Sequence, residues 1–391
     1  MLARAVLFLS LAAFASAAAL RAPDPMLPLI AADFGTTPGG ASAVIMGFAV
    51  AYGLLQLVSG PVADRIGKYR MVFVVTALSA FGNLACALAP SLATLVAARF
   101  LTGATVGAIV PLAMAWIGDA VPYERRQPVL ARFLIGHMFG VALTTAAAGF
   151  LGERFGWRAV FVLVAALYAV VALLLFFELR NNPQARAMSP AAGGLAESFR
   201  RMARLTRLPW VRVMLATVFV EGGLFNGGAV FVALELHLRF GLSLGASGSI
   251  AAAAVAGSLL YASFAGRILP RLGERGLVLG GGVSLALGFL GLALMPAPGW
   301  AVPCMVALGA GFYMMHNTLQ VHATQMAPEA RGAALALFAC SLFTGQSVGV
   351  WLASHAVDAG GARPVFLVAA VGLVLLALDF RRRLATLRRS A

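Results

Sequence analysis

At residues 60–67 the sequence reads Gly60-Pro61-Val62-Ala63-Asp64-Arg65-Ile66-Gly67, at the end of an apolar run over 42–62. A related stretch ends a second apolar run, over 246–267, and reads Gly266-Arg267-Ile268-Leu269-Pro270-Arg271-Leu272-Gly273. Glycine, arginine and glycine match at an offset of 206 residues, and Pro122 and Arg125 recur as Pro328 and Arg331 at the same offset. Two separate loops that share one offset indicate an internal parallel repeat, so both halves of the chain are predicted to fold alike.

Apolar runs of this kind extend along the whole chain. Of its 391 residues 61% are hydrophobic and 11% are charged, whereas a soluble globular protein carries about a quarter charged residues. A helix needs about 20 apolar residues to cross a bilayer, and runs that are apolar on every face lack the alternating pattern of a β-barrel. The sequence therefore predicts an all-α polytopic membrane protein with twelve transmembrane helices, over 5–30, 42–62, 71–89, 92–117, 128–151, 158–179, 211–236, 246–267, 277–296, 300–324, 332–355 and 363–380.

The net charge of +15 follows the membrane topology. With the N-terminus inside, the basic residues lie in inner segments or their flanks, apart from Arg21, Arg99, Arg154, Arg158, Arg239 and Arg363. This positive-inside distribution predicts that both termini are cytoplasmic, in a bacterial inner membrane. The excess charge is assigned to contact with anionic lipid headgroups on the cytoplasmic side, and no nucleic-acid partner is expected.

The longest polar stretch divides the chain into two sets of six spans. We predict an N-terminal six-helix bundle at 1–179, a cytoplasmic linker at 180–210 and a C-terminal six-helix bundle at 211–391. Within the linker, residues 195–208 alternate apolar residues and arginines at helical spacing, which predicts an amphipathic helix on the inner membrane face. A parallel repeat places a site near the membrane midplane, between two bundles that can rock about it.

The first 25 residues also look like a signal peptide, because Arg4 precedes an apolar run with small residues at 15–17. The run continues through Pro28 to Ala32, longer than the apolar core of a signal peptide. Cleavage would also break the repeat, so we expect the segment to remain as the first span.

The repeated loops at 60–67 and 266–273, together with the motifs below, make the chain resemble the major facilitator superfamily over essentially its whole length. Residues 60–70 are similar to the family's G-x-x-x-D-R-x-G-R-R loop between helices 2 and 3, and 99–107 look like the R-x-x-x-G motif of helix 4. Residues 24–35 resemble the first helix of bacterial twelve-helix efflux permeases. Gly136, Gly140, Gly149 and Gly152, followed by Trp157 and Arg158, resemble the antiporter region of helix 5, although the usual Gly-Pro pair is replaced by Leu143-Thr144-Thr145-Ala146.

The resemblance implies a cytoplasmic gate. Asp64, Arg65 and Arg125 would pair across the inner ends of helices and latch the outward-open state. The other residues of this set are Gly60, Gly67 and Arg271. The alternative is that Asp64 only caps a helix N-terminus, where an acid is favourable.

Three charged residues within spans are candidates for proton coupling: Asp24, Glu221 and Arg99. Charges inside a membrane are costly and usually face a cavity. A carboxyl that is neutral when desolvated and ionised when water or a cation enters suits this role. Arg99 keeps its proton, so it could tune a nearby acid or bind an anion; alternatively it reaches the outer headgroups. Asp24 can pair with Arg21 three residues away, and both could instead lie near the outer headgroups.

Polar residues within spans could line the central cavity as substrate-binding groups. They are Arg21, His137, Glu221, Asn226, His316, Asn317, Gln320 and Gln346. Interhelical hydrogen bonds that brace packing are the alternative. No metal site is expected, because His316 and His322 are six residues apart without an acid or cysteine beside them. Cys86, Cys304 and Cys340 are assigned to packing, and no cofactor is expected.

The prediction is a secondary active transporter that couples protons to efflux of a small amphiphilic molecule by alternating access, and a monomer is expected. An importer or uniporter of a metabolite is the alternative within the same class. A membrane enzyme or a non-transporting receptor is the alternative from another class, but the chain shows no nucleophile–base pair or catalytic domain, and neither would require the repeat.

Overall fold

The computed structural model describes residues 2–187, 195–327 and 330–390, and among them helices are the only regular secondary structure. The side chains of 123–124 and 386–390 are not described, and Pro328 of the predicted repeat lies outside the described residues. The predicted all-α polytopic fold is confirmed.

The first half contains nine α-helices and a 3₁₀ turn among the described residues: α1 Leu2–Arg21, η1 Asp24–Met26, α2 Leu27–Phe34, α3 Pro38–Ala41, α4 Ala43–Ile66, α5 Lys68–Ala87, α6 Leu92–Val106, α7 Ile109–Ala120, α8 Tyr123–Phe155 and α9 Trp157–Asn181. The linker contains α10 Pro183–Arg186 and α11 Leu195–Leu205. The second half contains α12 Pro209–Ala229, α13 Val232–Phe240, α14 Leu244–Leu294, η2 Pro298–Trp300, α15 Ala301–Gln325, α16 Arg331–Gly360 and α17 Arg363–Ser390.

Eleven segments among the described residues are long and apolar enough to cross a membrane, and one of them, α14, has 51 residues. Gly273 interrupts α14 with φ 62° and ψ 174°, outside the helical region. The two parts correspond to the predicted spans 246–267 and 277–296. Twelve membrane-crossing helices therefore account for the described chain, as the sequence predicted.

Backbone turns confirm the internal repeat. The described residues with positive φ are all glycines, and they form three pairs offset by 206, 206 and 205 residues: Gly35 with Gly241, Gly67 with Gly273, and Gly156 with Gly361. Only glycine adopts this conformation at little steric cost. The helices that begin after Gly35 and Gly241 are capped alike. Thr37 accepts from the Gly40 N–H, and Ser243 accepts from the Ala246 N–H. The two halves thus share their turns as well as their spans.

Two repeat-related spans are broken near the same point. In the first span the chain leaves the α-helix after Arg21 and resumes at Leu27, where Pro25 lacks the N–H that a continuous helix needs. In the seventh span the break falls between Ala229 and Val232. Both breaks expose backbone groups that membrane proteins place at cavities or protein interfaces.

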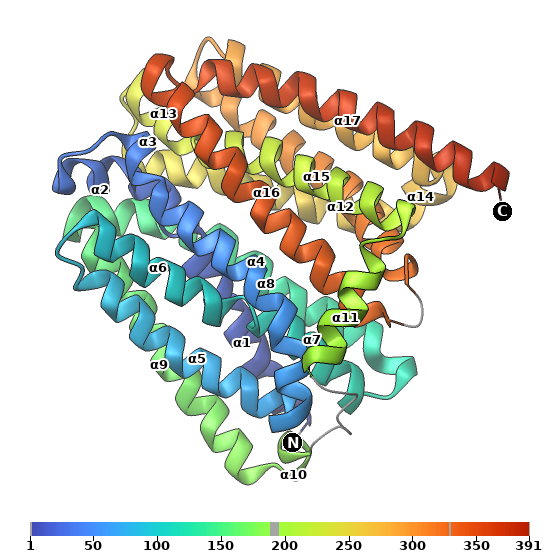
Figure 1. Ribbon diagram of the computed structural model, residues 1–391. Coiled ribbons are helices and arrows are strands. Elements are labelled where there is room, and N and C mark those ends of the chain that lie inside the picture. The colour runs from blue at the N-terminus through green and yellow to red at the C-terminus, as the bar shows by residue number, and fades with distance from the viewer. Residues whose placement is uncertain (1, 188–194, 328–329, 391) are drawn as a thin grey trace.

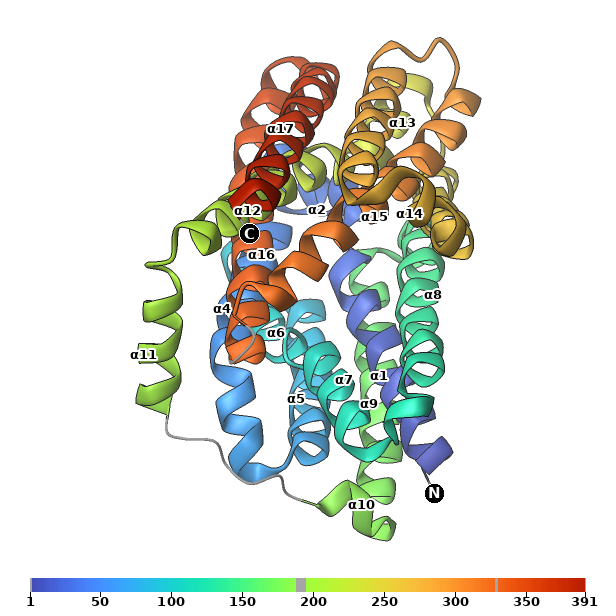
Figure 2. The ribbon, with the colours of Figure 1, turned by 90° about the vertical axis from the view of Figure 1, so that its right-hand side faces the viewer.

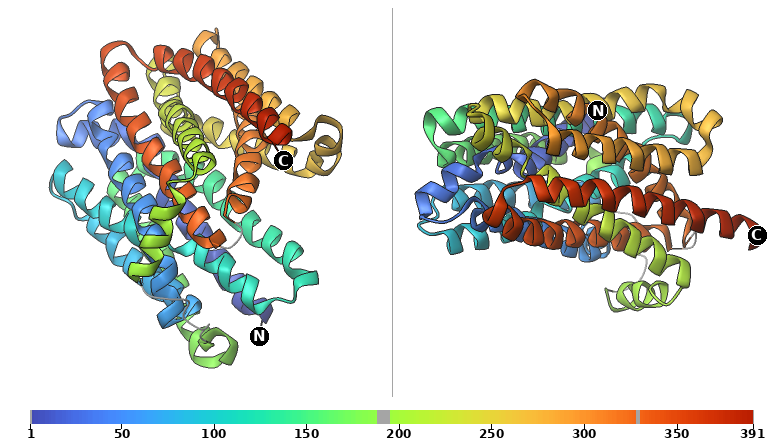
Figure 3. Two further views of the ribbon diagram at one scale, coloured as in Figure 1. Left: turned by 45° about the vertical axis from the view of Figure 1, so that its right-hand side comes forward. Right: turned by 90° about the horizontal axis from the view of Figure 1, so that it is seen from above.

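The helices of the two halves form two groups, drawn blue to green and yellow to red in Figure 2, and α11 lies beside α4. The groups meet where α4 packs on α16 and α8 packs on α14. Both termini, α10 and α11 lie toward one end of the molecule, and α2, α3 and α13 lie toward the other (Figures 1 and 3). Large apolar side chains on the outside, such as Phe81 and Leu101, suit contact with lipid.

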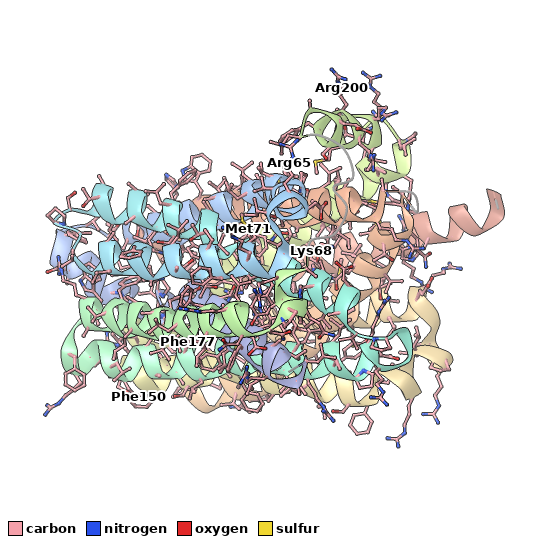
Figure 4. All side chains as sticks on the ribbon, turned by 90° about the horizontal axis from the view of Figure 1, so that it is seen from below. Arg65, Lys68, Met71, Phe150, Phe177 and Arg200 are labelled. Carbon is pink, nitrogen blue, oxygen red and sulfur yellow. The ribbon has the colours of Figure 1, made fainter. Side chains whose placement is uncertain are left out.

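The predicted amphipathic helix of the linker is present as α11. Its Met202 and Leu205 are buried, and it contacts α4 of the first half and α16 of the second half. Arg200 points away from the helices (Figure 4). This helix therefore joins the two halves at the end that carries the termini.

Candidate functional site

A cavity of about 740 Å³ lies between the two halves. Its wall combines aromatic and polar side chains of α4, α15 and α16: Tyr52, Gln56, His316, Gln320, Phe338 and Phe343. Toward the end that carries the termini it is bordered by Asp64, by Arg331 and by Arg201 of α11. An apolar cavity with a few polar groups is the usual form of a small-molecule site.

A carboxyl–imidazole pair lies behind this wall. Glu221 of α12 is fully buried, and its Oε2 lies 2.8 Å from Nδ1 of His316 on α15, which lines the cavity. The other oxygen, Oε1, has no hydrogen-bond partner among the described residues. The imidazole stacks on Phe312 with ring centres 4.8 Å apart and lies 5.5 Å from Phe338. His316 thus connects a buried carboxyl to the cavity.

A second polar cluster joins the two halves at their broken spans. Arg21 of α1 donates to Asp24 at 3.2 Å and to Oδ1 of Asn226 on α12 at 3.1 Å. Asp24 is buried, and its Oδ1 has no partner among the described residues. The expected pairing of Arg21 with Asp24 is therefore present, and both side chains are largely buried. Neither residue lines the cavity.

Arg99 is fully buried, so the alternative of an arginine reaching the headgroups is wrong. Its guanidinium donates to the carbonyl oxygens of Ala19 at 2.8 Å and Val44 at 3.2 Å and lies 4.0 Å above the ring of Phe48. A side chain at Gly103, four residues on, would clash with the backbone of Phe48, which explains why this motif needs glycine. Asp24 acts on Arg99 through its charge, without an ion pair between them, and the hydrogen bonds of Arg99 join α6 to α1 and α4.

The remaining substrate-binding candidates are spread over the bundle. Gln320 is exposed and lines the cavity, whereas Asn317 is half-buried outside the cavity wall. His137 also lies outside it and makes an interhelical hydrogen bond with the carbonyl oxygen of Ala13 at 3.1 Å. Gln346 is buried outside the wall, and its Nε2 has no partner among the described residues. Of the eight candidates, His316 and Gln320 line the cavity, and Glu221 reaches it through His316.

Two of the six predicted gate residues border the cavity. Gly60 and Asp64 line it, and Asp64 has Lys68 3.9 Å away; Lys68 also lies 2.5 Å from Asp119. In the described part of the chain no ion pair joins Asp64 to Arg65 or Arg125, which are both exposed, as is Arg271. Gly67 makes the sharp turn between α4 and α5. None of the ion pairs expected for the cytoplasmic gate is therefore formed among the described residues.

Glu178 of α9 is a buried acid that was not among the predicted site residues. Its side chain is fully buried, Arg4 of α1 lies 2.6 Å away, and Asn182 donates to it at 2.8 Å. The hydroxyl of Tyr69 nearby has no partner among the described residues. An acid at the end of an apolar run was the available signal, but its position beside Arg180 made it resemble an ordinary span end. This cluster braces α1 and α9 away from the cavity.

We expect Arg99→Lys to lower the free energy of unfolding by about 1–2 kcal/mol, because an ammonium group cannot reproduce the fork of donors to two helices. The thermal midpoint of the purified protein should fall by roughly 3–6 °C. Arg154→Lys, at an exposed arginine of α8, is the matched control. Equal thermal midpoints for the two variants would show that the hydrogen bonds of the buried Arg99 guanidinium contribute nothing to stability.

Across the described ranges no group of three histidine, cysteine or acidic side chains is placed to hold a metal ion.

Two repeated sets of six membrane-crossing helices with a cavity between them define a class, the secondary transporters that work by alternating access. The sequence matches the profile of the Major Facilitator Superfamily over residues 9–339. The chain belongs to this superfamily, and the prediction of a transporter rather than an enzyme is confirmed.

Relatives agree with this assignment. The chain is 27% identical to the inner membrane transport protein YdhP of Escherichia coli over 222 residues, 56% of this chain and 55% of that protein. It is 31% identical over 152 residues to MdtD of Yersinia pestis, a protein named for multidrug resistance, covering 38% of this chain and 33% of the relative. The matches thus span about half of the first relative and a third of the second. They support a multi-pass inner-membrane location.

Solved structures show the same fold. The nucleoside transporter NupG aligns with a TM-score of 0.79 at 16% identity, over 96% of this chain and 98% of that one. The xylose transporter XylE of E. coli aligns with a TM-score of 0.72 at 15% identity, over 96% of each chain. At this identity the likeness concerns the fold alone.

Proposed function

We propose that this protein is a proton-coupled exporter of a small amphiphilic molecule, with Glu221 as the coupling acid. The observation that carries the proposal is the contact between the buried Glu221 and His316 at the cavity wall. Protonation can drive transport only if it changes the relative stability of two states. A buried carboxyl whose partner faces the cavity meets this requirement, because a substrate that disturbs His316 changes the surroundings of the carboxyl.

Residues 1–179 and 211–391 would rock as two bundles about the cavity. The cavity reaches the end that carries the termini, which the distribution of basic residues predicts to be cytoplasmic. In this state a substrate would enter from the cytoplasm. Arg21, Asp24 and Asn226 join the halves on the far side of Glu221, and Asp24 is the second candidate for the coupling acid.

The side chains of the cavity wall suit a substrate that has both apolar and polar parts. Tyr52 and Phe343, with ring centres 4.2 Å apart, and Phe338 offer flat apolar surface. Gln56, His316 and Gln320 offer hydrogen bonds. The name of the relative MdtD favours drug-like compounds, and that of YdhP states only transport.

An importer or uniporter of a metabolite is the second candidate, favoured by the absence of a Gly-Pro pair in α8. Energised inside-out vesicles that hold the purified protein separate the two. Labelled lipophilic cations, amino acids and sugars would be tested for accumulation. An exporter concentrates its substrate inside these vesicles, and accumulation only in right-side-out vesicles would overturn the proposal.

Asp64→Asn tests the proposed gate. We expect turnover to fall about tenfold with substrate affinity nearly unchanged, because Asp64 lies at the mouth and acts when the cavity closes. Transport rates and binding of the same substrate would be measured on one preparation. Arg180→Gln, at an exposed arginine beyond the end of the sixth predicted span, is the control. Wild-type turnover in the Asp64 variant would exclude the gating role.

A further inference from the structure

The end of the molecule opposite the cavity mouth is held closed by two carboxylates that bind backbone amides of the other half. Glu153, near the end of α8, accepts from the N–H groups of Leu244 and Gly245 at 2.6 and 3.3 Å. Asp358, near the end of α16, accepts from the N–H of Gly39 at 2.9 Å and from the Thr37 hydroxyl at 2.7 Å.

The two contacts are related by the internal repeat. Glu153 and Asp358 are 205 residues apart, and so are their amide partners Gly39 and Leu244. In each case the acid lies three residues before a glycine with positive φ, Gly156 or Gly361. An acid of the first half thus closes onto the second half, and an acid of the second half closes onto the first. Because the same contact occurs at two repeat-related positions between the halves, neither is an isolated surface hydrogen bond.

The chemistry suits a contact that must form and break. Amides at the start of a helix carry partial positive charge and lack intrahelical acceptors, so a carboxylate stabilises them. Hydrogen bonds from a charged acceptor are stronger than neutral ones. Both acids are exposed, so water can replace these bonds when the halves separate. The contacts are therefore strong enough to bias the equilibrium between the two transport states and weak enough to break when the halves separate.

We propose that Glu153 and Asp358 form a paired latch, which stabilises the state whose cavity is open at the opposite end. They are positioning residues for transport, since neither lines the cavity. The inference rests on alternating access in the proposed function, but not on proton coupling, substrate or orientation in the membrane. Removing the carboxylate charges should shift the protein toward the state that is open at the latch end.

Two reporter cysteines can measure this shift in a background in which Cys86, Cys304 and Cys340 are replaced by serine. Ser247→Cys reports on the latch end, because Ser247 is fully buried beside Gly248, which packs on the Thr145 backbone. Ala336→Cys reports on the cavity, whose wall includes Ala336. A charged maleimide would be reacted with each reporter in lipid nanodiscs, where both faces are accessible.

Glu153→Gln and Asp358→Asn should each raise the labelling rate at position 247 about threefold, and the double variant about tenfold, as the loss of partly exposed charged hydrogen bonds predicts. The rate at position 336 should fall in the same variants. Asp33→Asn is the matched control, because Asp33 also lies at this end but contacts Trp157 and Arg158 of its own half. This variant should leave both rates unchanged.

An unchanged rate at position 247 in the single and double variants would overturn the proposal. A rise at both reporters would also overturn it, because general loosening exposes both sites whereas a shift between two states exposes one and hides the other. The single amide variants keep the shape of each side chain, so the result does not depend on the double variant folding. The measurement uses neither substrate nor a proton gradient, so its outcome is separate from that of the proposed function.

Discussion

Replacing Glu221 with glutamine is expected to reduce proton-driven substrate accumulation by about 100-fold, near the upper range of coupling between two sites. Glutamine has the same shape and can keep a hydrogen bond to His316, whose Nδ1 lies 2.8 Å from Oε2 of Glu221. It cannot take up or release a proton, so the two transport states lose the difference that a gradient acts on. Accumulation of substrate in energised vesicles measures the effect.

Exchange of labelled for unlabelled substrate without a gradient is the internal control for this variant. We expect exchange to continue, because the cavity wall is unchanged. His316→Gln should retain exchange and weaken substrate binding, since the imidazole lines the cavity. If Glu221→Gln accumulates substrate like the wild type while Asp24→Asn does not, the coupling acid is Asp24 and our assignment is wrong.

Replacing Gly309 with valine is expected to lower the free energy of unfolding by about 3 kcal/mol or more, the upper range for overpacking. A side chain at Gly309 of α15 would clash with the backbone oxygen of Ala254 in α14, and one at Gly257 would clash with that of Val306. Each of the two helices thus places a glycine against the backbone of the other. Small residues that allow such close approach drive helix association in membranes.

The thermal midpoint of the Gly309 variant should fall by roughly 10 °C, as followed by the loss of monodisperse protein on heating. Gly118→Val is the matched control, because a side chain added at this helical glycine of α7 meets open space. Similar midpoints for Gly309→Val and the control would mean that α14 and α15 do not depend on this contact.

The repeat made the fold predictable from the sequence. The loops at 60–67 and 266–273 predicted a break that the structure places at Gly273, inside what is otherwise one 51-residue helix. Helix breaks after Arg21 and Ala229 were harder to locate, because the predicted spans 5–30 and 211–236 run on past both of them. Pro25 lies at the first break, but no proline marks the second.

The candidate site was predictable as a set of residues but not as an arrangement. Glu221 and His316 each stood out as polar groups in apolar spans, yet they are 95 residues apart and only packing shows that they touch. His137 had the same signal and packs against the backbone of Ala13 instead. Nothing in the sequence singled out Glu153 and Asp358, whose offset of 205 differs by one residue from the 206 of the loops.

The most direct test of the account is the movement of protons when substrate is added. Inside-out vesicles would carry the protein and a proton gradient reported by a pH-sensitive dye, with Asp24→Asn and Glu221→Gln vesicles alongside. We predict that a transported compound discharges the gradient in the wild type and in Asp24→Asn but not in Glu221→Gln. Transport of the compound by the wild type with no change in the dye signal would contradict proton coupling and establish facilitated transport in its place.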